Sequence, residues 1–460
     1  MHRPFAVPAR IARIAGSTVG IAAVALAAIT LAPAAHADSV SPPASIDATG
    51  ATDVTAALDD WIAGTPDRST ITLAADARYR VDGVIQIRNR RGLVIEGNGA
   101  TIVAPDDGSS SEPTQRSLAG KWPRNRRHVA ISGSTDITVR DLAIDGPDTD
   151  GAYDPALEGQ AGFVIGGSTD VTLERVDVRE VWGDGVYIGG GSEAVRIVDS
   201  TFDLIGRQGV AIVNGVDVVV ERNRFDRVAR SVFDVEPVRR WKVERVTLRD
   251  NAVGDYGNFL LASGGGGENV TDLRLEGNEI DGGRGLTVFA GVARSPRRGL
   301  AIVGNSSDVV GNPAEGTSAI RIVNYADVEI RDNRGRVEHD AIAITLNAVC
   351  EVVIDGNEWR DASAESRETA ACGETPDTER PGADGSGTGD TDDTDRASDG
   401  TSAGSAGRAA PSASEVPVWL YGVAGGVLVL LVIVEAARFR RRRRRAARER
   451  GGDPPRDQTR

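Results

Sequence analysis

A short pattern that recurs ten times between residues 93 and 357 constrains the fold of this 460-residue chain more than any other feature. Each copy has two aliphatic residues separated by one position, and three positions later a corner residue, which is Asn in seven copies. The copies are Leu93-Ile95-Asn98, Ile137-Val139-Leu142, Val171-Leu173-Val176, Val195-Ile197-Ser200, Val218-Val220-Asn223, Val246-Leu248-Asn251, Leu273-Leu275-Asn278, Leu300-Ile302-Asn305, Val328-Ile330-Asn333 and Val352-Ile354-Asn357. The alternation predicts short strands with one buried face, and spacings of mostly 23 to 28 residues leave no room for a packed helix in every repeat.

A second series of apolar pairs lies between the copies of the first. Its members are Phe163-Ile165, Val186-Ile188, Val210-Ile212, Phe233-Val235, Phe259-Leu261, Leu286-Val288, Ile320-Ile322 and Ile342-Ile344. Only 4% of the residues are aromatic, so aliphatic side chains must build nearly all of the core. Two or three short strands in each repeat, stacked about 4.8 Å apart, predict an all-β parallel β-helix of about ten turns.

The corner asparagines form one column, which we interpret as scaffold because Asn tolerates left-handed backbone and its amide can bond to the next turn. The column consists of Asn98, Asn223, Asn251, Asn278, Asn305, Asn333 and Asn357. It resembles the internal asparagine ladder of the right-handed parallel β-helix family, within the pectate-lyase-like superfold. The resemblance implies a right-handed, single-stranded β-helix. That superfold hosts polysaccharide lyases, glycoside hydrolases, uronate epimerases and non-catalytic adhesins, so the site must decide the function.

The N-terminal segments are expected to direct secretion and to begin the stack. Arginines precede an apolar run that ends at Ala35-His36-Ala37, so residues 1–37 are predicted to be a signal peptide. Residues 38–103 are predicted to hold an N-terminal cap and the first turns, because Asp53–Ala63 reads as an amphipathic helix that would cover the open end. A loop insertion at 104–127 separates them from the main β-helix at 128–360.

The C-terminal segments predict a membrane anchor. Residues 361–415 form an acidic stretch with few large aliphatic residues, which we expect to be a disordered linker. Residues 416–434 are apolar and long enough for one transmembrane helix, and a basic tail at 435–460 follows. The arginines of that tail predict a single-pass protein of the cell membrane, with the N-terminal domain outside and the tail in the cytoplasm.

Cysteine and histidine usage bears on disulfides and metals. Cys350 and Cys372 are the only cysteines, and in an extracellular chain we expect them to form a disulfide near the C-terminal end of the stack. Only His128 and His339 lie beyond residue 37, which argues against a histidine-rich metal site. No metal site is predicted.

The densest set of candidate functional residues lies between residues 182 and 236. If the apolar pairs of the second series face inward, then Asp184, Tyr187, Gln208, Asp234 and Glu236 face outward. We predict Asp184, Asp234 and Glu236 as catalytic carboxylates, with Asp184 and Asp234 two turns, or about 10 Å, apart. That separation is near the one that an inverting glycosidase needs.

Substrate-binding residues are predicted around these carboxylates. Arg207 would hold a uronate carboxylate through paired hydrogen bonds, with Tyr187 and Gln208 beside it. The segments around Asp184, Arg207 and Asp234 resemble turns of bacterial right-handed β-helix proteins. The His-Gly of polygalacturonases is replaced here by Gln208-Gly209. A tight turn or a solvated strand would also explain these polar residues.

Two excursions interrupt the repeat, and we expect them to form a wall beside the face that carries the predicted site residues. The first contains Trp122 and Arg127, predicted to stack on sugar and to attract anionic groups. The second, from Gly146 to Gln160, would bring Glu158 and Gln160 to the same face. A solvated loop is the alternative interpretation of both.

The leading hypothesis is a membrane-anchored extracytoplasmic protein that acts on or binds a carbohydrate polymer, with hydrolysis by Asp184, Asp234 and Glu236 as the most concrete mechanism. The alternatives are a non-catalytic glycan-binding or adhesion protein, a surface spacer, and a uronate polysaccharide lyase or epimerase. No cofactor is expected, except calcium for a lyase. The expected partners are a polysaccharide or cell-wall glycan and the membrane, without nucleic acid, for which the net charge of -14 is unsuited, and the protein is expected to be a monomer.

Overall fold

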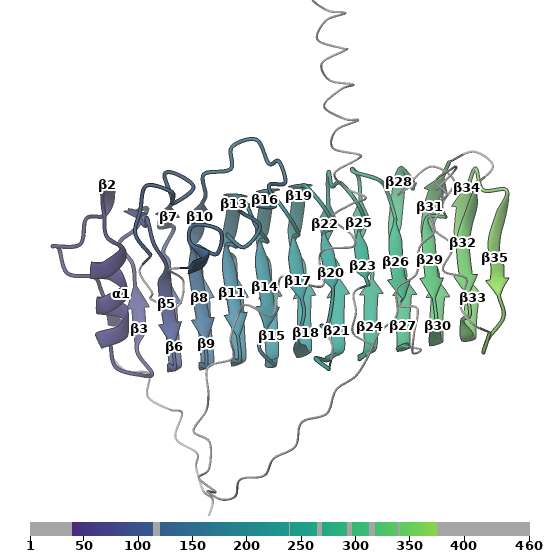
Figure 1. Cartoon of the computed structure of the whole chain (residues 1–460), viewed down its shortest axis with the longest axis horizontal. Coiled ribbons are helices and arrows are strands. Elements are labelled where there is room, and N and C mark those ends of the chain that lie inside the picture. Colours follow the sequence, from purple (N-terminus) through teal and green to yellow (C-terminus); the bar gives the residue numbers. More distant parts are fainter. Residues whose placement is uncertain are drawn as a thin grey trace, which may run out of the picture. The chain divides into compact units, whose positions relative to one another are not determined.

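The computed structural model describes residues 39–113, 120–238, 240–264, 269–291, 297–311, 318–338 and 341–374. These residues form an all-β parallel β-helix of about eleven turns, with three strands in most turns (Figure 1). The sequence predicted about ten turns, because the template begins at Leu93 and misses the short strands before it.

Three parallel sheets run along the stack, and we call them sheets A, B and C. Sheet A contains β1 (Ser39–Val40), β3 (Thr70–Thr72), β6 (Arg91–Glu96), β9 (Thr135–Arg140), β12 (Thr169–Glu174), β15 (Ser192–Val198), β18 (Gly215–Glu221), β21 (Val243–Arg249), β24 (Val270–Glu276), β27 (Arg297–Val303), β30 (Tyr325–Arg331) and β33 (Cys350–Asp355). Sheet B contains β2 (Thr49–Asp53), β4 (Arg78–Arg80), β7 (Thr101–Val103), β10 (Ala143–Asp145), β13 (Asp177–Val181), β16 (Thr201–Ile205), β19 (Arg224–Val228), β22 (Ala252–Val253), β25 (Glu279–Ile280), β28 (Ser306–Gly311), β31 (Arg334–Val337) and β34 (Glu358–Arg360). Sheet C contains β5 (Ile85–Arg88), β8 (Val129–Ser132), β11 (Phe163–Gly166), β14 (Val186–Gly189), β17 (Val210–Ile212), β20 (Phe233–Val235), β23 (Leu261–Ser263), β26 (Val288–Gly291), β29 (Ile320–Val323), β32 (Ile342–Asn347) and β35 (Ala364–Ala370).

The ten copies of the template are the strands β6 to β33 of sheet A, and they pair in the predicted register. Leu93 pairs with Ile137, and the same column continues turn by turn to Val352. Inward-facing aliphatic side chains fill the interior as one continuous core. The few aromatic residues extend it, as in the stacked pair of Phe202 and Phe225, whose ring centroids are 4.9 Å apart.

The second series lies in sheet C, but its register differs from the prediction by two residues at three places. Phe233 pairs with Leu261 rather than with Phe259, and Ile320 pairs with Val288 rather than with Leu286. Ile320 also pairs with Ile344 rather than with Ile342. Because side chains alternate with a period of two, a shift of two residues leaves an apolar pattern on the same face, so the sequence pattern cannot detect it. Phe259 is half-buried instead, and its ring contacts that of Phe289.

A ladder of buried asparagines joins the turns between sheets A and B. In Asn278, for example, Nδ2 donates to Leu248 O and to Asn305 Oδ1, over 3.0 and 2.8 Å. The same bonds run without interruption from Asn223 to Asn357. Asn98, predicted as a member, lies outside this ladder, because the next two turns place Leu142 and Val176 at the corner; its Nδ2 donates to Leu73 O over 3.4 Å.

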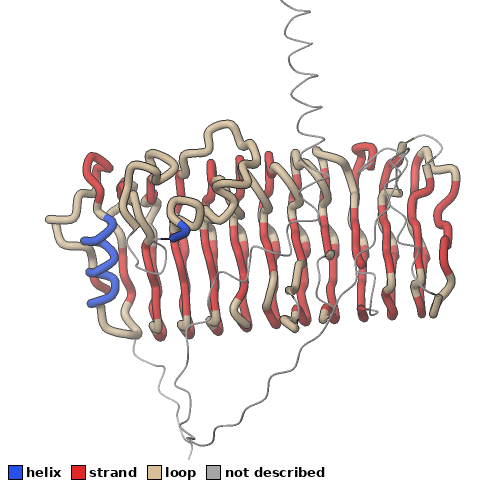
Figure 2. Tube along the Cα trace, viewed as in Figure 1, coloured by secondary structure: helices blue, strands red, loops and turns tan. Residues whose placement is uncertain are grey.

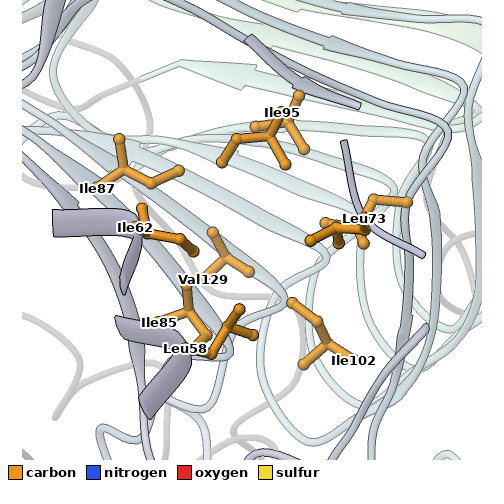
Figure 3. Close-up of a pocket in the computed structure, with 10 residues that line it drawn as sticks. Leu58, Ile62, Leu73, Ile85, Ile87, Ile95, Ile102 and Val129 are labelled. Atoms are coloured by element: carbon orange, nitrogen blue, oxygen red, sulfur yellow. The ribbon is translucent and has the colours of Figure 1, made fainter. Parts of the chain in front are cut away.

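One helix, α1 (Thr55–Gly64), lies at the N-terminal end of the stack. Leu58 and Ile62 are four residues apart and therefore share one face, and both are buried in the core. With Ile85, Ile87 and neighbouring side chains they line an apolar cavity of about 20 Å³ (Figure 3). The helix thus buries its apolar face against the first turns.

The last turn differs from the prediction that a linker begins at residue 361. Strand β35 pairs in parallel with β32 as the last strand of sheet C (Figure 2). The disulfide between Cys350 and Cys372 ties the segment after β35 to β33. The sequence of β35 is polar because most of its side chains face solvent, so its composition resembles that of a linker.

The predicted signal peptide, the linker beyond residue 374, the transmembrane helix and the basic tail lie outside the described residues. Among the residues that are described, no helix is both long and apolar enough to span a membrane.

Candidate functional site

The predicted site residues gather where β14, β17 and β20 of sheet C begin and on the outer face of those strands. Strand pairing sets one outward column, in which Tyr187, Ala211, Asp234, Ala262 and Phe289 occupy successive strands. Asp234 is therefore at the centre of the column, with Tyr187 two strands before it and Phe289 two strands after it.

Asp184 lies at the bend before β14 and forms an ion pair with Arg207 of the next turn. The Nη1 atom of Arg207 is 3.0 and 2.9 Å from the two carboxylate oxygens of Asp184. The backbone N–H of Gln208 donates to Asp184 Oδ1 over 3.2 Å, and the backbone N–H of Ser231 donates to Gln208 Oε1 over 2.8 Å. Asp184 and Gln208 thus hold consecutive turns together at this bend.

This arrangement corrects the predicted geometry of the carboxylates. Val186 pairs with Val210, and Val210 pairs with Phe233. Asp184, Gln208 and Ser231 each lie two residues before one of these three, so they occupy one column. Asp234 instead follows Phe233 and pairs with Ala211. The two aspartates are therefore not directly above each other. Both are also buried, with 2% and 7% of Asp184 and Asp234 exposed, rather than fully outward.

Asp234 and Glu236 are alternate residues at the end of β20, so they face the same side. Burial, reinforced by the negative charge of Glu236, raises the pKa of Asp234 to about 8, although the charge of Arg207 opposes this rise. Burial also raises the pKa of Asp184, again against the effect of Arg207. At neutral pH, Asp234 consequently keeps its proton in the folded protein.

Arg207 is the cation around which the acidic side chains are arranged. Burial would lower the pKa of this guanidinium, but the carboxylates of Asp184, Asp234, Glu158 and Glu236 outweigh burial and raise it. The side chain of Arg207 is 20% exposed, so it also reaches the surface of the site. We call Asp184, Arg207, Asp234, Glu236 and Glu158 the acid–arginine cluster.

The excursion between β10 and β11 brings Glu158 into this cluster, as the sequence predicted. Tyr153 Oη donates to Glu158 Oε2 over 2.7 Å, Arg124 forms an ion pair with Glu158, and Arg207 Nε lies 3.9 Å from Glu158 Oε2. Burial opposes ionisation, but Tyr153 and the two arginines more than compensate and lower the pKa of Glu158. Glu158 is therefore held as a carboxylate.

Tyr153 and Arg230 were not among the predicted site residues. The guanidinium of Arg230 lies over the Tyr153 ring, 4.8 Å from its centroid, and the backbone N–H of Arg230 donates to Arg207 O over 3.0 Å. A cation over an aromatic face is stabilising. The signal in the sequence was Tyr153 as a lone aromatic residue inside a long excursion, together with Arg207 and Arg230 in two consecutive turns.

The insertion before β8 carries the other two predicted binding residues. Trp122 packs against Val84 and Ala130, and its indole N–H donates to Gly108 O over 2.8 Å. Arg127 is half-buried, and its charge adds to burial in lowering the pKa of Lys121. Trp122 thus lies over β8, two strands before Tyr187.

Gln160, which was expected at the same face, is fully buried and joins the two excursions. Its Nε2 donates to Asp107 O and Pro123 O over 2.7 and 2.9 Å, and its Oε1 accepts from Arg126 over 3.3 Å. His128 is also buried, and its burial, together with the nearby charge of Arg126, lowers its pKa to about 3.

The described residues contain no group of three or more His, Cys, Asp or Glu side chains placed to hold a metal ion. The acid–arginine cluster instead combines Asp234, whose carboxyl pKa is raised, with Glu158, whose pKa is lowered, and with Arg207. Such a set can donate a proton, accept a proton and bind an anionic or hydroxyl-rich ligand.

Known proteins share this architecture. Residues 127–314 match the family described as the right-handed β-helix region. The endo-xylogalacturonan hydrolase of Aspergillus tubingensis has 13% identity and a TM-score of 0.52, and the match covers 75% of this chain and 100% of the hydrolase. Among curated proteins, none matches this sequence significantly.

Two further solved structures are similar at lower TM-scores. The A-module of the mannuronan C-5 epimerase AlgE6 of Azotobacter vinelandii has 18% identity and a TM-score of 0.49, over 70% of this chain and 88% of the module. The surface adhesin PfbA of Streptococcus pneumoniae has 12% identity and a TM-score of 0.46, over 70% of this chain and 91% of the adhesin. The strand arrangement establishes that this chain is a parallel β-helix protein, and residues 127–314 of it are similar to the right-handed β-helix region.

Proposed function

We propose that this protein hydrolyses glycosidic bonds of a carbohydrate polymer on the outer face of sheet C. The observation that supports this most is the position of Asp234 in β20 and Glu236 directly after it, two carboxyl groups beside Arg207. Their Cα atoms are about 7 Å apart, because a strand rises about 3.3 Å per residue. Glycoside hydrolysis needs two carboxyl groups that flank the scissile bond.

In the proposed reaction, Asp234 is the general acid and Glu236 the general base. Asp234 gives its proton to the glycosidic oxygen as the bond from that oxygen to the anomeric carbon breaks. Glu236 removes a proton from the water whose oxygen forms the new bond to that carbon. A carboxyl group whose pKa is raised by burial retains the proton that the acid must deliver.

The remaining cluster residues position the substrate. Asp184 uses both oxygens on Arg207, and we propose that it orients this guanidinium rather than reacting itself. The other Arg207 donors and Arg230 would bind carboxylate or hydroxyl groups of the sugar. Tyr187 on the same face offers an aromatic surface to a sugar ring.

A glycan-binding protein without turnover is the second candidate. It is favoured by the fact that Asp184 and Glu158 already have arginine partners, as in a rigid structural cluster. A lyase or epimerase with calcium has less support, since the described residues hold no acidic group suited to that ion.

We further propose an extracytoplasmic location with a single membrane anchor, from the apolar segment at 416–434 and the arginines after it. The proposed protein is a monomer that needs no cofactor and binds no nucleic acid. The buried apolar face of α1 supports a role as the cap of the N-terminal end. Membrane fractionation with protease protection of the tail would test the topology.

The function is tested with the purified full chain and a panel of polygalacturonate, xylogalacturonan and alginate. Reducing ends and the absorbance of unsaturated products are followed together. New reducing ends without unsaturated products support hydrolysis, and unsaturated products support a lyase. Saturable binding without any product supports the binding protein.

A further inference from the structure

We infer that the acid–arginine cluster acts at the end of a polysaccharide chain rather than within it, because its N-terminal side is closed by protein and its C-terminal side is open. This inference rests on the function proposed above and specifies which part of the polymer the site accepts. It depends on three features of the described residues: a covered stretch of sheet C, a fixed wall and an open stretch.

The covered stretch is the outer face of β8. Ala130 belongs to the same outward column as Val164, Tyr187 and Asp234. Trp122 packs on Ala130, and its indole N–H is bonded to Gly108. A polymer that continued along the column past Tyr187 would meet this indole ring instead of an open strand face.

The wall is built from both excursions, and buried contacts join them. Gln160, at the end of the second excursion, donates to Asp107 O and Pro123 O of the first. Arg126 is fully buried and donates to Gln160 Oε1. Because these groups are buried, separating the excursions would break all three hydrogen bonds at once. The wall is therefore a fixed part of the site and not a closing lid.

A second contact brings the wall up to the cluster itself. Glu158 bonds to Arg124 of the first excursion and lies 3.9 Å from Arg207 of the cluster. Tyr153 bonds to Glu158 and packs under Arg230. The wall therefore stands directly beside the residues proposed to bind the sugar.

The open stretch begins at the strand after Asp234. Ala262, Phe289, Arg321 and Thr345 continue the outward column over β23, β26, β29 and β32, and all four are partly exposed. Phe289 is two strands, or about 10 Å, beyond Asp234 and offers an aromatic surface. Arg321 is one strand farther and offers a cation. The polymer would extend from Asp234 toward the C-terminal end of the stack.

The test compares long polygalacturonate with the same mass of a partially depolymerised sample, using the full chain; xylogalacturonan and alginate samples are prepared alike. With about tenfold more ends at fixed mass, the initial rate below saturation should rise about tenfold, because kcat/KM then refers to chain ends. Small products should accumulate while the viscosity of the long polymer falls slowly. A rate independent of the number of ends, with a rapid fall in viscosity, would overturn this inference and leave the proposed hydrolysis intact.

Failure of the proposed function has a different signature. If none of the three polymers is cleaved, the hydrolysis is wrong and the inference about chain ends is wrong with it. Two variants add a structural comparison. Phe289→Ala should raise KM for long chains. Asp199→Asn, which breaks an exposed ion pair with Arg222 at the corner between sheets A and B, should leave KM unchanged. An unchanged KM in Phe289→Ala would contradict the proposed direction of the polymer.

Discussion

Arg207 reaches back one turn of the β-helix to Asp184, and its Nη1 atom lies 3.0 and 2.9 Å from the two oxygens of that carboxylate. The side chain of Asp184 is 3% exposed and that of Arg207 is 20% exposed. The pair is therefore mostly removed from water, unlike the many ion pairs on the outer faces of sheets A and B. It fixes the guanidinium beside Asp234 and Glu236.

Breaking this pair should destabilise the protein strongly. Asp184→Asn leaves the Arg207 charge without its main partner, and removing one member of a buried pair costs about 3–5 kcal/mol. Because Arg207 is partly exposed, we expect the lower part of that range. Chemical unfolding of the full chain measures it, and Asp199→Asn, whose ion pair is exposed, should lose at most about 1 kcal/mol. Equal losses in both variants would contradict the role given to the Asp184–Arg207 pair.

The raised pKa of Asp234 predicts a specific dependence of stability on pH. The folded-state pKa, about 8, is above the value of an unfolded Asp, so the folded state binds more protons between about pH 4 and pH 8. Stability from this group is complete at low pH and is lost as the pH rises through about 8. The wild type should therefore lose stability relative to Asp234→Asn over this interval, by at most about 1.4 kcal/mol per pH unit.

The free energies of unfolding of the two proteins, measured across that interval, check this prediction. Asp148 also has a pKa raised, to about 7, by burial, but it titrates in both proteins, so the difference between them removes its contribution. A difference that stays constant from pH 4 to pH 8 would show that the Asp234 carboxyl titrates normally.

The asparagine ladder should contribute more in its middle than at its end. Asn278→Ala removes the acceptor of Asn251 and the donor to Leu248 O inside the protein, which costs about 1–3 kcal/mol for each group left unpaired. Asn357→Ala should cost less, because Asn357 is only partly buried and water can replace it. Thermal unfolding of both variants gives the comparison, and an equal loss in the two would argue against it.

The helix α1 should stabilise the first turns through its apolar face. Leu58 is 1% exposed and already borders a small cavity, so Leu58→Ala enlarges unfilled space and should cost about 2–5 kcal/mol. Asp60→Ala, on the exposed side of the same helix, should change stability by less than about 0.5 kcal/mol. If Leu58→Ala were as stable as Asp60→Ala, α1 would not support the stack.

The sequence allowed the strands of sheet A to be predicted in register, because a strict template ties Leu93 to Val352 through eight intermediate turns. Sheet C was less predictable, since a slip of two residues at Phe259 keeps the same face apolar. Strand β35 was missed because it is polar and is held by backbone pairing and a disulfide. Sequence composition indicates which side chains are buried, whereas backbone pairing and a disulfide can hold a strand whose side chains are exposed.

The sequence predicted which residues gather at the site better than it predicted how they are arranged. Asp184, Arg207, Asp234 and Glu158 do gather, but Asp184 proved to be the partner of Arg207 rather than a carboxylate stacked on Asp234. The bend before β14 causes this difference, because strand alternation cannot be extended through it. Tyr153 and Arg230 meet only through the path of a loop, which no repeat pattern specifies.

The most direct measurement of the central claim is the initial rate of reducing-end formation by the wild type, Asp234→Asn and Asp199→Asn on the same polymer. Loss of the general acid should lower the rate by about 10²–10⁴-fold in Asp234→Asn, whereas Asp199→Asn should match the wild type. The wild-type rate should also fall as the pH rises through about 8. Equal rates in Asp234→Asn and the wild type, or no product from any of the three proteins, would contradict the account.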